Sequence, residues 1–339
     1  MRIVLIGVSH WHTPFYLDPA LALPQIAITG VSDPDLARAQ EIAARAGCRA
    51  WKDCRAMCTE AAPDFAFVLG KHCDMAEIAR FLVDARIPFA IEKPCGISAA
   101  EVRDLAERAE AAGTFAAVPL VFRQSPLLDA IREATAGEAL QVASFKFIGG
   151  MVDRYREARC EWMLSRATAG GGALINLGVH FLDLCRVLLP DARLAVSGAA
   201  LSNAVAGLDI DDHAVVLLRG GGATCMVETG YLYPAPNSVF DLHYSIRTER
   251  HYVAVRDAGS VEVVDMSRHR RVLSMPTINA PLYPDFVADV LRRVERGEPP
   301  VAGLADMAAV MELVEAACRT SPLCPSGTRG GQPAVSDAF

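Results

Sequence analysis

The stretch that decides the fold is Arg2-Ile3-Val4-Leu5-Ile6-Gly7-Val8-Ser9-His10-Trp11-His12, which is followed at once by Thr13-Pro14. A short apolar run that stops at a glycine and gives way to a helix-start signal is typical of a buried parallel strand leading into a helix. The same alternation recurs through the first 120 residues, with further apolar runs at 26–32, 64–69, 88–91 and 115–120. We therefore predict an α/β fold in which residues 1–120 form a doubly wound parallel sheet.

Beyond residue 120 the pattern changes to consecutive strands. β-rich stretches separated by Gly, Asp and Asn turns favour a mostly antiparallel sheet with one face covered by helices. The stretches are 141–148, 214–219, 224–229, 239–246, 252–255 and 261–264, and the helices are expected after Ser125-Pro126 and at 173–189, 284–296 and 304–319. We predict a second α/β domain over 121–320, built on a large open sheet, and a flexible tail at 321–339.

Composition excludes several classes of protein. The chain has 339 residues, 52% of them hydrophobic, and a formal net charge of −7. This acidic balance argues against binding to nucleic acid, because affinity for a phosphate backbone depends on clustered Lys and Arg. There is no run of 18 apolar residues to span a membrane. Ten cysteines without a signal-peptide pattern indicate reduced thiols, so we expect a cytoplasmic protein.

The turn after the first strand stands where a dinucleotide-binding fold places its phosphate loop. Only Gly7 of the three fingerprint glycines is present, and Ser9 and His12 hold the other two places. An ordinary strand-to-helix turn is the alternative. Asp33 ends the second strand 21 residues beyond His12, close to the spacing of a carboxylate that binds the ribose hydroxyls and favours NAD over NADP. Asp33 could instead cap the next helix. His10 and His12 lack neighbouring metal-ligand residues, so we expect no metal.

Lys93 is the first candidate for chemistry. The chain uses 29 arginines and only four lysines, and Glu92-Lys93-Pro94 follows a strand of the parallel sheet. Ligands of such sheets bind beyond the carboxyl ends of the strands. A lysine is a compact donor whose pKa shifts readily on desolvation, which suits hydrogen bonding to a reacting hydroxyl. A solvated surface lysine is the alternative.

The second candidate is the segment Gly170-Gly171-Gly172-Ala-Leu-Ile-Asn176-Leu-Gly-Val-His180. Asn176 and His180 are four residues apart, so a helix would place them on one face, where they would meet the same substrate. A neutral imidazole can take the proton of an alcohol while a hydride leaves the same carbon. The glycine triplet permits close approach of backbone. A structural histidine is the alternative, and we interpret Asp183 as a surface or structural residue.

Taken together, these motifs resemble the glucose-fructose oxidoreductase / inositol dehydrogenase / rhizopine-catabolism (Gfo/Idh/MocA) family over residues 1 to about 320. The resemblance implies an N-terminal Rossmann domain, a C-terminal α/β domain that forms a homodimer or homotetramer through its sheet, and hydride transfer between NAD(P) and a sugar, polyol or related cyclic compound. It implies His180 as acid/base with Asn176 and Lys93 as catalytic partners, Lys93 on the substrate and the nicotinamide ribose, and Arg123 and Trp162 near nicotinamide or substrate. It also suggests a cis Lys93–Pro94 bond. The cofactor-binding residues it implies are Gly7, Ser9, His10, Trp11, His12, Asp33, Leu69, Lys71, Glu92, Lys93 and Arg123, and the substrate-binding residues are Lys93, Arg123, Trp162, Asn176 and His180.

The chain departs from that family's pattern at two further places besides the phosphate turn. Asn176 stands where most relatives carry Asp, and the loop 69–75 after the fourth strand lacks the usual Thr-Pro. Two other functions therefore stay open. One is a glycosidase or lyase that oxidises and re-reduces its substrate with bound NAD. The other is a redox-silent, nucleotide-binding regulator.

Overall fold

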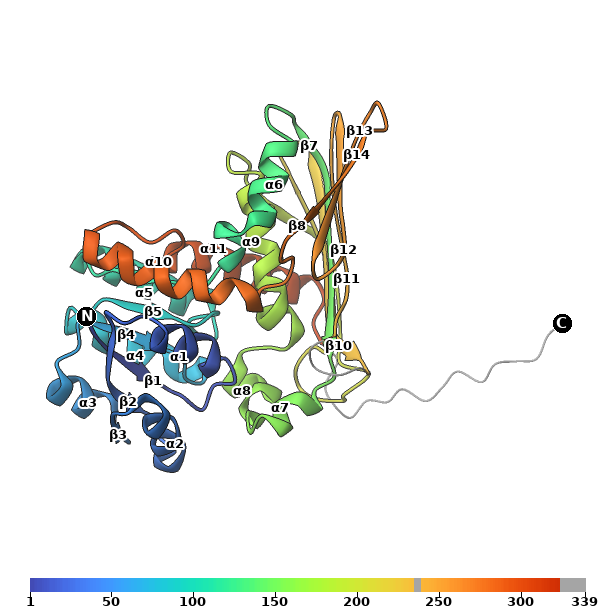
Figure 1. Ribbon diagram of the computed structural model, residues 1–339. Helices are drawn as coiled ribbons and strands as arrows, with labels where there is room; N and C mark the ends of the chain where they lie inside the picture. Colours follow the sequence, from blue (N-terminus) through green and yellow to red (C-terminus); the bar gives the residue numbers. More distant parts are fainter. Residues whose placement is uncertain (235–238, 324–339) are drawn as a thin grey trace, which may run out of the picture.

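The protein is built on two sheets in a computed structural model that describes residues 1–234 and 239–323 (Figure 1). The first has six parallel strands in the order β3-β2-β1-β4-β5-β6. This is the order of a doubly wound dinucleotide-binding sheet, and it confirms the predicted fold class. The strands are β1 (Arg2–Ile6), β2 (Ala27–Ser32), β3 (Arg49–Trp51), β4 (Phe65–Val68), β5 (Phe89–Ile91) and β6 (Ala116–Ala117).

Helices connect these strands, and the residues at the helix ends show why the helices start and stop there. Ser98 begins a helix by accepting the amide of Glu101 at 3.2 Å, and Gly47 and Gly113 end helices with φ of 67° and 63°, which a side chain would disfavour. The helices are α1 (Thr13–Leu21), α2 (Leu36–Ala46), α3 (Cys54–Ala61), α4 (His72–Asp84) and α5 (Ala99–Ala112). The segment expected as a loop at 69–75 is therefore helical from His72.

The second sheet has eight strands in the order β14-β13-β12-β11-β7-β10-β9-β8. Its pairs are antiparallel except for β7 and β10, so the prediction of a mostly antiparallel sheet is confirmed. Figure 1 shows it edge-on, with α6 (Pro126–Ala134), α9 (Val179–Leu188) and α11 (Leu304–Thr320) on one face. The strands are β7 (Leu140–Gly150), β8 (Ala195–Ser202), β9 (His213–Gly220), β10 (Ala223–Tyr233), β11 (Asp241–Thr248), β12 (His251–Asp257), β13 (Ser260–Asp265) and β14 (Arg270–Ser274).

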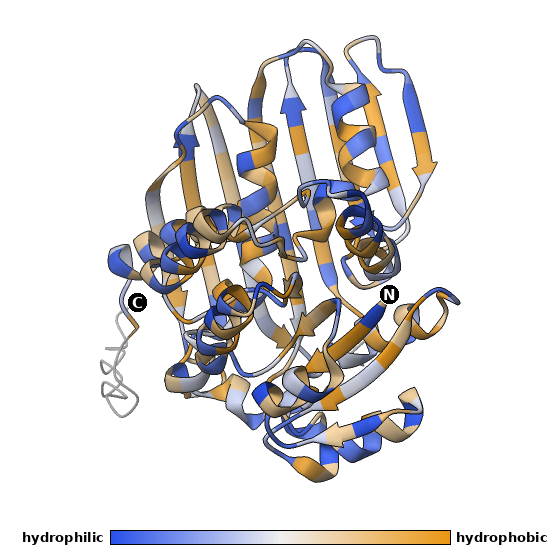
Figure 2. Cartoon of the chain, turned by 90° about the vertical axis from the view of Figure 1, so that its left-hand side faces the viewer, coloured by the Kyte–Doolittle hydropathy of each residue, from blue (hydrophilic) through white to orange (hydrophobic). Residues whose placement is uncertain are grey.

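The last two helices return to the first sheet. In Figure 1, α10 (Tyr283–Arg296) and α11 run along one side of the first sheet and pack on α1 and α5, so in the view of Figure 2 they stand in front of the second sheet. Ala99 at the start of α5 donates its amide to Glu315 of α11 at 2.8 Å, and Gly303 forms a bridge with Ala117 of β6. The segment after residue 282 therefore packs on the predicted first domain as well as on the second. Of the predicted tail, 324–339 lie outside the described residues, while Ser321 accepts the amide of Leu201 at 3.0 Å.

One helical stretch, Arg166–Leu188, is long and apolar enough to cross a membrane by length and composition alone, and 78% of its most apolar window is buried inside the protein. It comprises α8 (Arg166–Ala169), a π-helical turn η3 (Leu174–Gly178) and α9. Its apolar side chains thus belong to the core between the second sheet and the first domain.

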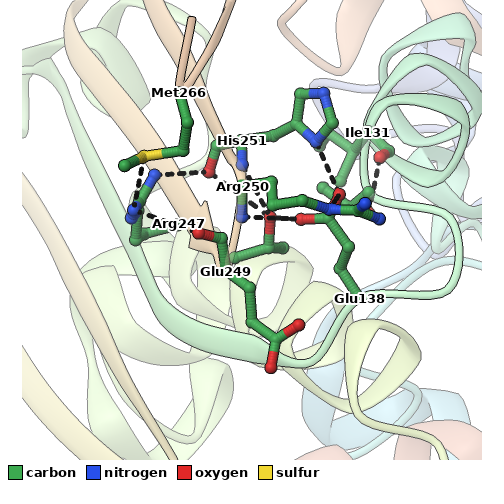
Figure 3. Close-up of polar contacts among 9 residues, drawn as sticks. Ile131, Glu138, Arg247, Glu249, Arg250, His251 and Met266 are labelled. Carbon is green, nitrogen blue, oxygen red and sulfur yellow. Dashed lines mark hydrogen bonds and ion pairs between the residues drawn. The ribbon is translucent and has the colours of Figure 1, made fainter.

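Glu138 ties the loop before β7 to the β11–β12 hairpin (Figure 3). Its carboxylate accepts from Thr248 Oγ1 at 2.6 Å, from the Arg250 amide at 2.9 Å and from His251 Nδ1 at 2.7 Å. These donors, with Thr248 contributing most, lower the pKa of Glu138 to about 2. The contact fixes one end of the sheet far from the first domain.

Candidate active site

The turn between β1 and α1 is shaped by one glycine. Gly7 has φ of 77°, and a Cβ placed on it would lie 2.2 Å from the amide nitrogen of Gly70, in the loop between β4 and α4. Only glycine fits so close a contact between two backbones. Leu69, which was predicted to bind the cofactor, is fully buried next to this turn, and its amide donates to the backbone oxygen of Ile6.

Asp33 holds this turn from the end of β2. One carboxylate oxygen accepts the amide of Ser9 at 2.7 Å, and the other accepts the amide of Asp35 at 2.8 Å. The N-cap of α2 is Asp35, whose carboxylate accepts from Ala37 and Arg38. The alternative of Asp33 as the helix cap is therefore wrong, although its side chain does organise backbone. Each oxygen keeps a lone pair for another donor.

A cavity of about 560 Å³ opens beside this turn. It runs along Gly7, Ser9 and His10 to Asp33, and it is flanked by Lys71 and Trp162. Trp162 belongs to the segment after β7, so the second half of the chain supplies one wall. The Nε2 atom of His10 is buried without a hydrogen-bond partner among the described residues. Six predicted residues thus line one cavity: Gly7, Ser9, His10, Asp33, Lys71 and Trp162.

Glu92 is fully buried at the end of β5 and is held by its neighbours. Tyr16 donates to its carboxylate at 2.5 Å, Tyr283 donates at 3.4 Å, and His12 Nδ1 lies 3.2 Å from it. Burial is the main reason that the pKa of His12 is far below its usual value. The geometry gives Glu92 and His12 a structural role below the cavity, and neither of these two predicted cofactor residues lines it.

Lys93 points from the same strand end toward the second domain. Its ammonium donates to the backbone oxygen of Asn176 at 2.9 Å and also to the side-chain oxygen Oδ1. The Asn176 amide nitrogen donates in turn to Tyr155 at 2.6 Å and to Tyr231 at 3.0 Å. Desolvation lowers the pKa of Lys93 to about 8. The two predicted residues thus meet in one buried network, and the Lys93–Pro94 bond is cis, as predicted.

His180 is close enough to Lys93 for the charge of that ammonium to act on it. Burial, followed by the charge of Lys93, lowers its pKa to about 3, so the imidazole is neutral at physiological pH. Among the described residues, neither ring nitrogen has a hydrogen-bond partner, and Phe122 contacts the ring edge-on at a centroid distance of 6.0 Å. A buried neutral imidazole with two unused nitrogens is available to exchange a proton with a ligand.

The helix that carries Asn176 and His180 is held by Asp211. Its carboxylate accepts the amides of Gly172 at 2.8 Å and Leu174 at 2.7 Å, and a Cβ on Gly172 would lie 1.8 Å from its backbone oxygen. The glycine triplet thus serves close backbone approach, as predicted, and the partner is the Asp211 segment. Residues Leu174–Gly178 then form a π-helical turn, a feature often found at functional sites.

Arg123 has a structural role in this geometry. Its guanidinium donates to Asp183 at 2.6 and 2.8 Å and to Asp306 at 2.8 Å. It therefore joins η1 (Val121–Gln124) to α9 and α11. No described contact brings it to the cavity, so its predicted place beside cofactor or substrate gains no support from the geometry. Asp183 is a structural partner, as interpreted.

Sequence reasoning missed the aromatic wall of the site. Tyr155 and Tyr231 hold Asn176, and His72 contacts the Trp162 ring edge-on at a centroid distance of 5.0 Å. Trp11, predicted to bind cofactor, stands against Tyr155 at a centroid distance of 5.8 Å. No spacing in the sequence links these residues, because they come from α1, α4, α7 (Asp153–Glu157) and β10 and their flanks.

Two family models match the chain, in the order of the two sheets. The oxidoreductase family with an NAD-binding Rossmann fold matches residues 1–119, and the GFO/IDH/MocA C-terminal domain matches residues 129–254. Among solved structures, levoglucosan dehydrogenase in complex with NADH and levoglucosan is similar, with a TM-score of 0.82 at 17% identity over 95% of this chain and 98% of that one. That likeness shows the fold.

Curated relatives match parts of the chain. Trans-1,2-dihydrobenzene-1,2-diol dehydrogenase of Oryctolagus cuniculus is 26% identical over 219 residues, 62% of this chain and 64% of the relative. Rhizopine catabolism protein MocA of Rhizobium meliloti is 33% identical over 158 residues, 44% of this chain and 46% of the relative. The chain spans less than two thirds of the length of either relative. Because the two family models together cover more than half of it, the chain belongs to the Gfo/Idh/MocA oxidoreductase family.

Proposed function

We propose that this chain is an NAD(P)-dependent dehydrogenase or reductase that acts on a hydroxyl or keto carbon of a sugar, polyol or related cyclic compound. The observation that carries the proposal is the buried contact of Lys93 with Asn176, together with the imidazole of His180, whose ring nitrogens have no partner in the described part of the chain. Similarity to a dehydrogenase of a cyclic diol and to levoglucosan dehydrogenase supports the same class of reaction.

The cavity beside Gly7 fits a dinucleotide. Gly7 leaves the turn without a side chain, which suits approach of a pyrophosphate, and Asp33 stands at the other end with oxygens open to ribose hydroxyls. The unpartnered Nε2 of His10 adds a buried polar atom that a ligand would satisfy. A carboxylate in the position of Asp33 favours NAD over NADP. When bound, the nicotinamide supplies the hydride acceptor or donor.

The chain's own residues supply the acid–base chemistry. The ammonium of Lys93 donates two of its three N–H groups to Asn176, and the third is available to the oxygen at the reacting carbon. There the positive charge stabilises developing negative charge. Asn176 orients the ammonium and is itself fixed by two tyrosines. His180 accepts the hydroxyl proton during oxidation and returns it during reduction, since its imidazole is neutral before the reaction.

The test is a screen of sugars and polyols against NAD⁺ and NADP⁺, followed by reduced-nicotinamide absorbance. Lys93→Met is expected to reduce kcat by about 100-fold or more, the scale of a lost acid–base partner, while cofactor affinity, measured by tryptophan fluorescence, changes little. Lys146→Met is the matched control, because Lys146 pairs with Asp241 on the second sheet. Full activity of Lys93→Met with every accepted substrate would contradict the proposal.

The same screen separates the alternative functions. Stoichiometric formation of NADH with product supports a dehydrogenase, whereas cleavage of a glycosidic bond without net NADH would indicate transient oxidation by bound NAD. Nucleotide binding with no turnover of any compound would indicate a regulator.

We also propose a cytoplasmic homodimer or homotetramer assembled through the helix-free face of the second sheet. Exposed apolar side chains on that face support it, at Val142, Leu217, Tyr252 and Val272. Light scattering on Leu217→Glu would reveal dissociation, and an unchanged mass would count against this interface.

A further inference from the structure

Arg154 is a buried cation that has no counter-ion among the described residues. It lies on α7, directly after β7, with 8% of its surface exposed. Among residues 1–234 and 239–323, no carboxylate lies within 4.0 Å of its guanidinium. By contrast, Arg123, the other largely buried arginine of the site region, is paired with two carboxylates. Buried charges in proteins are normally paired, so the exception at Arg154 calls for a ligand.

The hydrogen bonds of Arg154 are also incomplete. Nη2 donates to Tyr155 at 2.6 Å, while Nε is buried with no partner among the described residues. The guanidinium carbon stands 4.7 Å from the ring of Tyr155, 5.1 Å from that of Tyr231 and 5.6 Å from that of Trp11. Ring faces attract a cation, but they offer no acceptor to the in-plane N–H groups. The aromatic side chains hold the guanidinium in place and leave its donors for something else.

A glycine in β7 makes room for the guanidinium of Arg154. A Cβ on Gly149 would lie 2.9 Å from Nη1, so the glycine at this position of β7 admits the guanidinium. Besides burial, the positive charge of Arg154 acts on Lys93 and helps to lower the pKa of the ammonium. Glu92, the carboxylate next to Lys93, already accepts hydrogen bonds from Tyr16 and Tyr283. An anion would balance the site.

Arg154 is linked to the reacting centre through one hydroxyl. Tyr155 receives hydrogen bonds from Arg154 and from Asn176, each at 2.6 Å, and Asn176 contacts Lys93. An anion bound by Arg154 would thus lie a few atoms from a hydroxyl bound by Lys93. A guanidinium presents a planar pair of donors that matches a carboxylate.

We infer that the substrate carries a carboxylate, received by Arg154, and is a sugar acid or hydroxylated ring acid rather than a neutral sugar. The inference rests on the proposed oxidoreductase function and narrows its substrate class. Arg154 is then a specificity-determining residue, and Lys93 and His180 act on a hydroxyl of the same molecule.

The experiment compares matched pairs of substrates: D-glucose with D-glucuronate and D-galactose with D-galacturonate, with D-glucose 6-phosphate as the phosphate arm. For at least one pair we expect kcat/KM to be about tenfold or more higher for the acid, as a charge-assisted bidentate contact allows. Arg154→Gln should remove that preference, so that kcat/KM falls about tenfold or more further for the acid than for the matched neutral sugar. Arg154→Lys should retain part of it, since a lysine keeps the charge without the fork.

Arg271→Gln is the control, because Arg271 is exposed on β14. Thermal melting of each variant, and quenching of tryptophan fluorescence by the uronate with NAD⁺ present, show whether a variant is folded and whether it has lost acid binding. Three results would overturn the inference while the proposed function stands. The protein could prefer neutral sugars, it could prefer the phosphate, or its preference for the acid could persist in Arg154→Gln. Absence of nicotinamide turnover with every compound would instead count against the proposed function.

Discussion

Lys93 is anchored by both oxygens of a single residue, Asn176, across the boundary between the two sheets. Lys93 follows β5 of the first sheet, and Asn176 lies in the π-helical turn beneath the second. Because the two elements are 83 residues apart in the chain, the contact exists only when the sheets are correctly assembled. The reacting centre is thus completed by the packing of one domain on the other.

The lowered pKa of Lys93 predicts an alkaline limit to activity. Its pKa of about 8 means that the ammonium predominates below that pH and loses its proton above it. We expect kcat/KM to be level at neutral pH and to fall above about pH 8. In Lys93→Arg the guanidinium stays charged, so any residual activity should lack this limb. A limb at the same pH in Lys93→Arg would assign it to another group.

Asn176→Asp should move that limit. A carboxylate at hydrogen-bonding distance favours the charged form of Lys93 and raises its pKa, by about one unit or more at this separation. The alkaline limb of the pH profile is then expected at higher pH than in the unmodified protein. Asn203→Asp, whose parent side chain donates to Leu208 in a loop of the second domain, serves as control and should leave the profile unchanged.

Gly7→Ala, in the turn beside the cavity, should destabilise the protein far more than Gly47→Ala. Gly7 and Gly47 both have positive φ, but a Cβ on Gly47 meets nothing within 4 Å, whereas a Cβ on Gly7 meets the backbone of Gly70. We expect Gly47→Ala to lower the free energy of unfolding by about 1–2 kcal/mol and Gly7→Ala to lower it by about 4 kcal/mol or more. Denaturant titration gives both values, and similar costs for the two variants would refute the close contact.

Glu138 predicts an acid-sensitive contribution to stability. Its folded pKa of about 2 is below its ordinary value of 4.5, so the stabilisation is complete above pH 4.5 and is lost as pH falls toward 2. Glu138→Gln should therefore melt at a lower temperature than the unmodified protein at pH 7, and the two curves should converge toward pH 2. A difference in Tm that is constant from pH 7 to pH 2.5 would exclude this role.

The sequence predicts those elements whose signals are local. The apolar runs of β1, β4 and β5 mark buried parallel strands. Ser125 followed by Pro126 marks the start of α6, where the Ser125 hydroxyl oxygen accepts the amide of Leu128 at 3.1 Å. β3 was missed because it has only three residues, β8 because its side chains are mostly small, and β14 because it begins with two arginines at a sheet edge. Short, small or charged strands form through their neighbours, and the neighbours are not adjacent in the chain.

The candidate site was only partly predictable, for the same reason. Lys93 and His180 stand out by residue type and position, but the role of Arg123 depends on Asp183 and Asp306, which lie 60 and 183 residues away. The start of the helix that contains the π turn is held by hydrogen bonds that the amides of Gly172 and Leu174 donate to Asp211, which lies 39 and 37 residues away. Such distant partners leave no periodicity in the sequence.

The π-helical turn at Leu174–Gly178 makes the arrangement of reacting groups depend on chain length as well as on residue identity. A π turn accommodates one residue more than an α turn between the same two ends. Deleting a single residue there would let the chain close as an α turn between the same two ends, so α9 would keep its place while the direction of the side chains within the turn would change. His180 would stay in α9, yet Asn176 would lose the position from which it holds Lys93, so the length of this turn sets the spacing between the two groups.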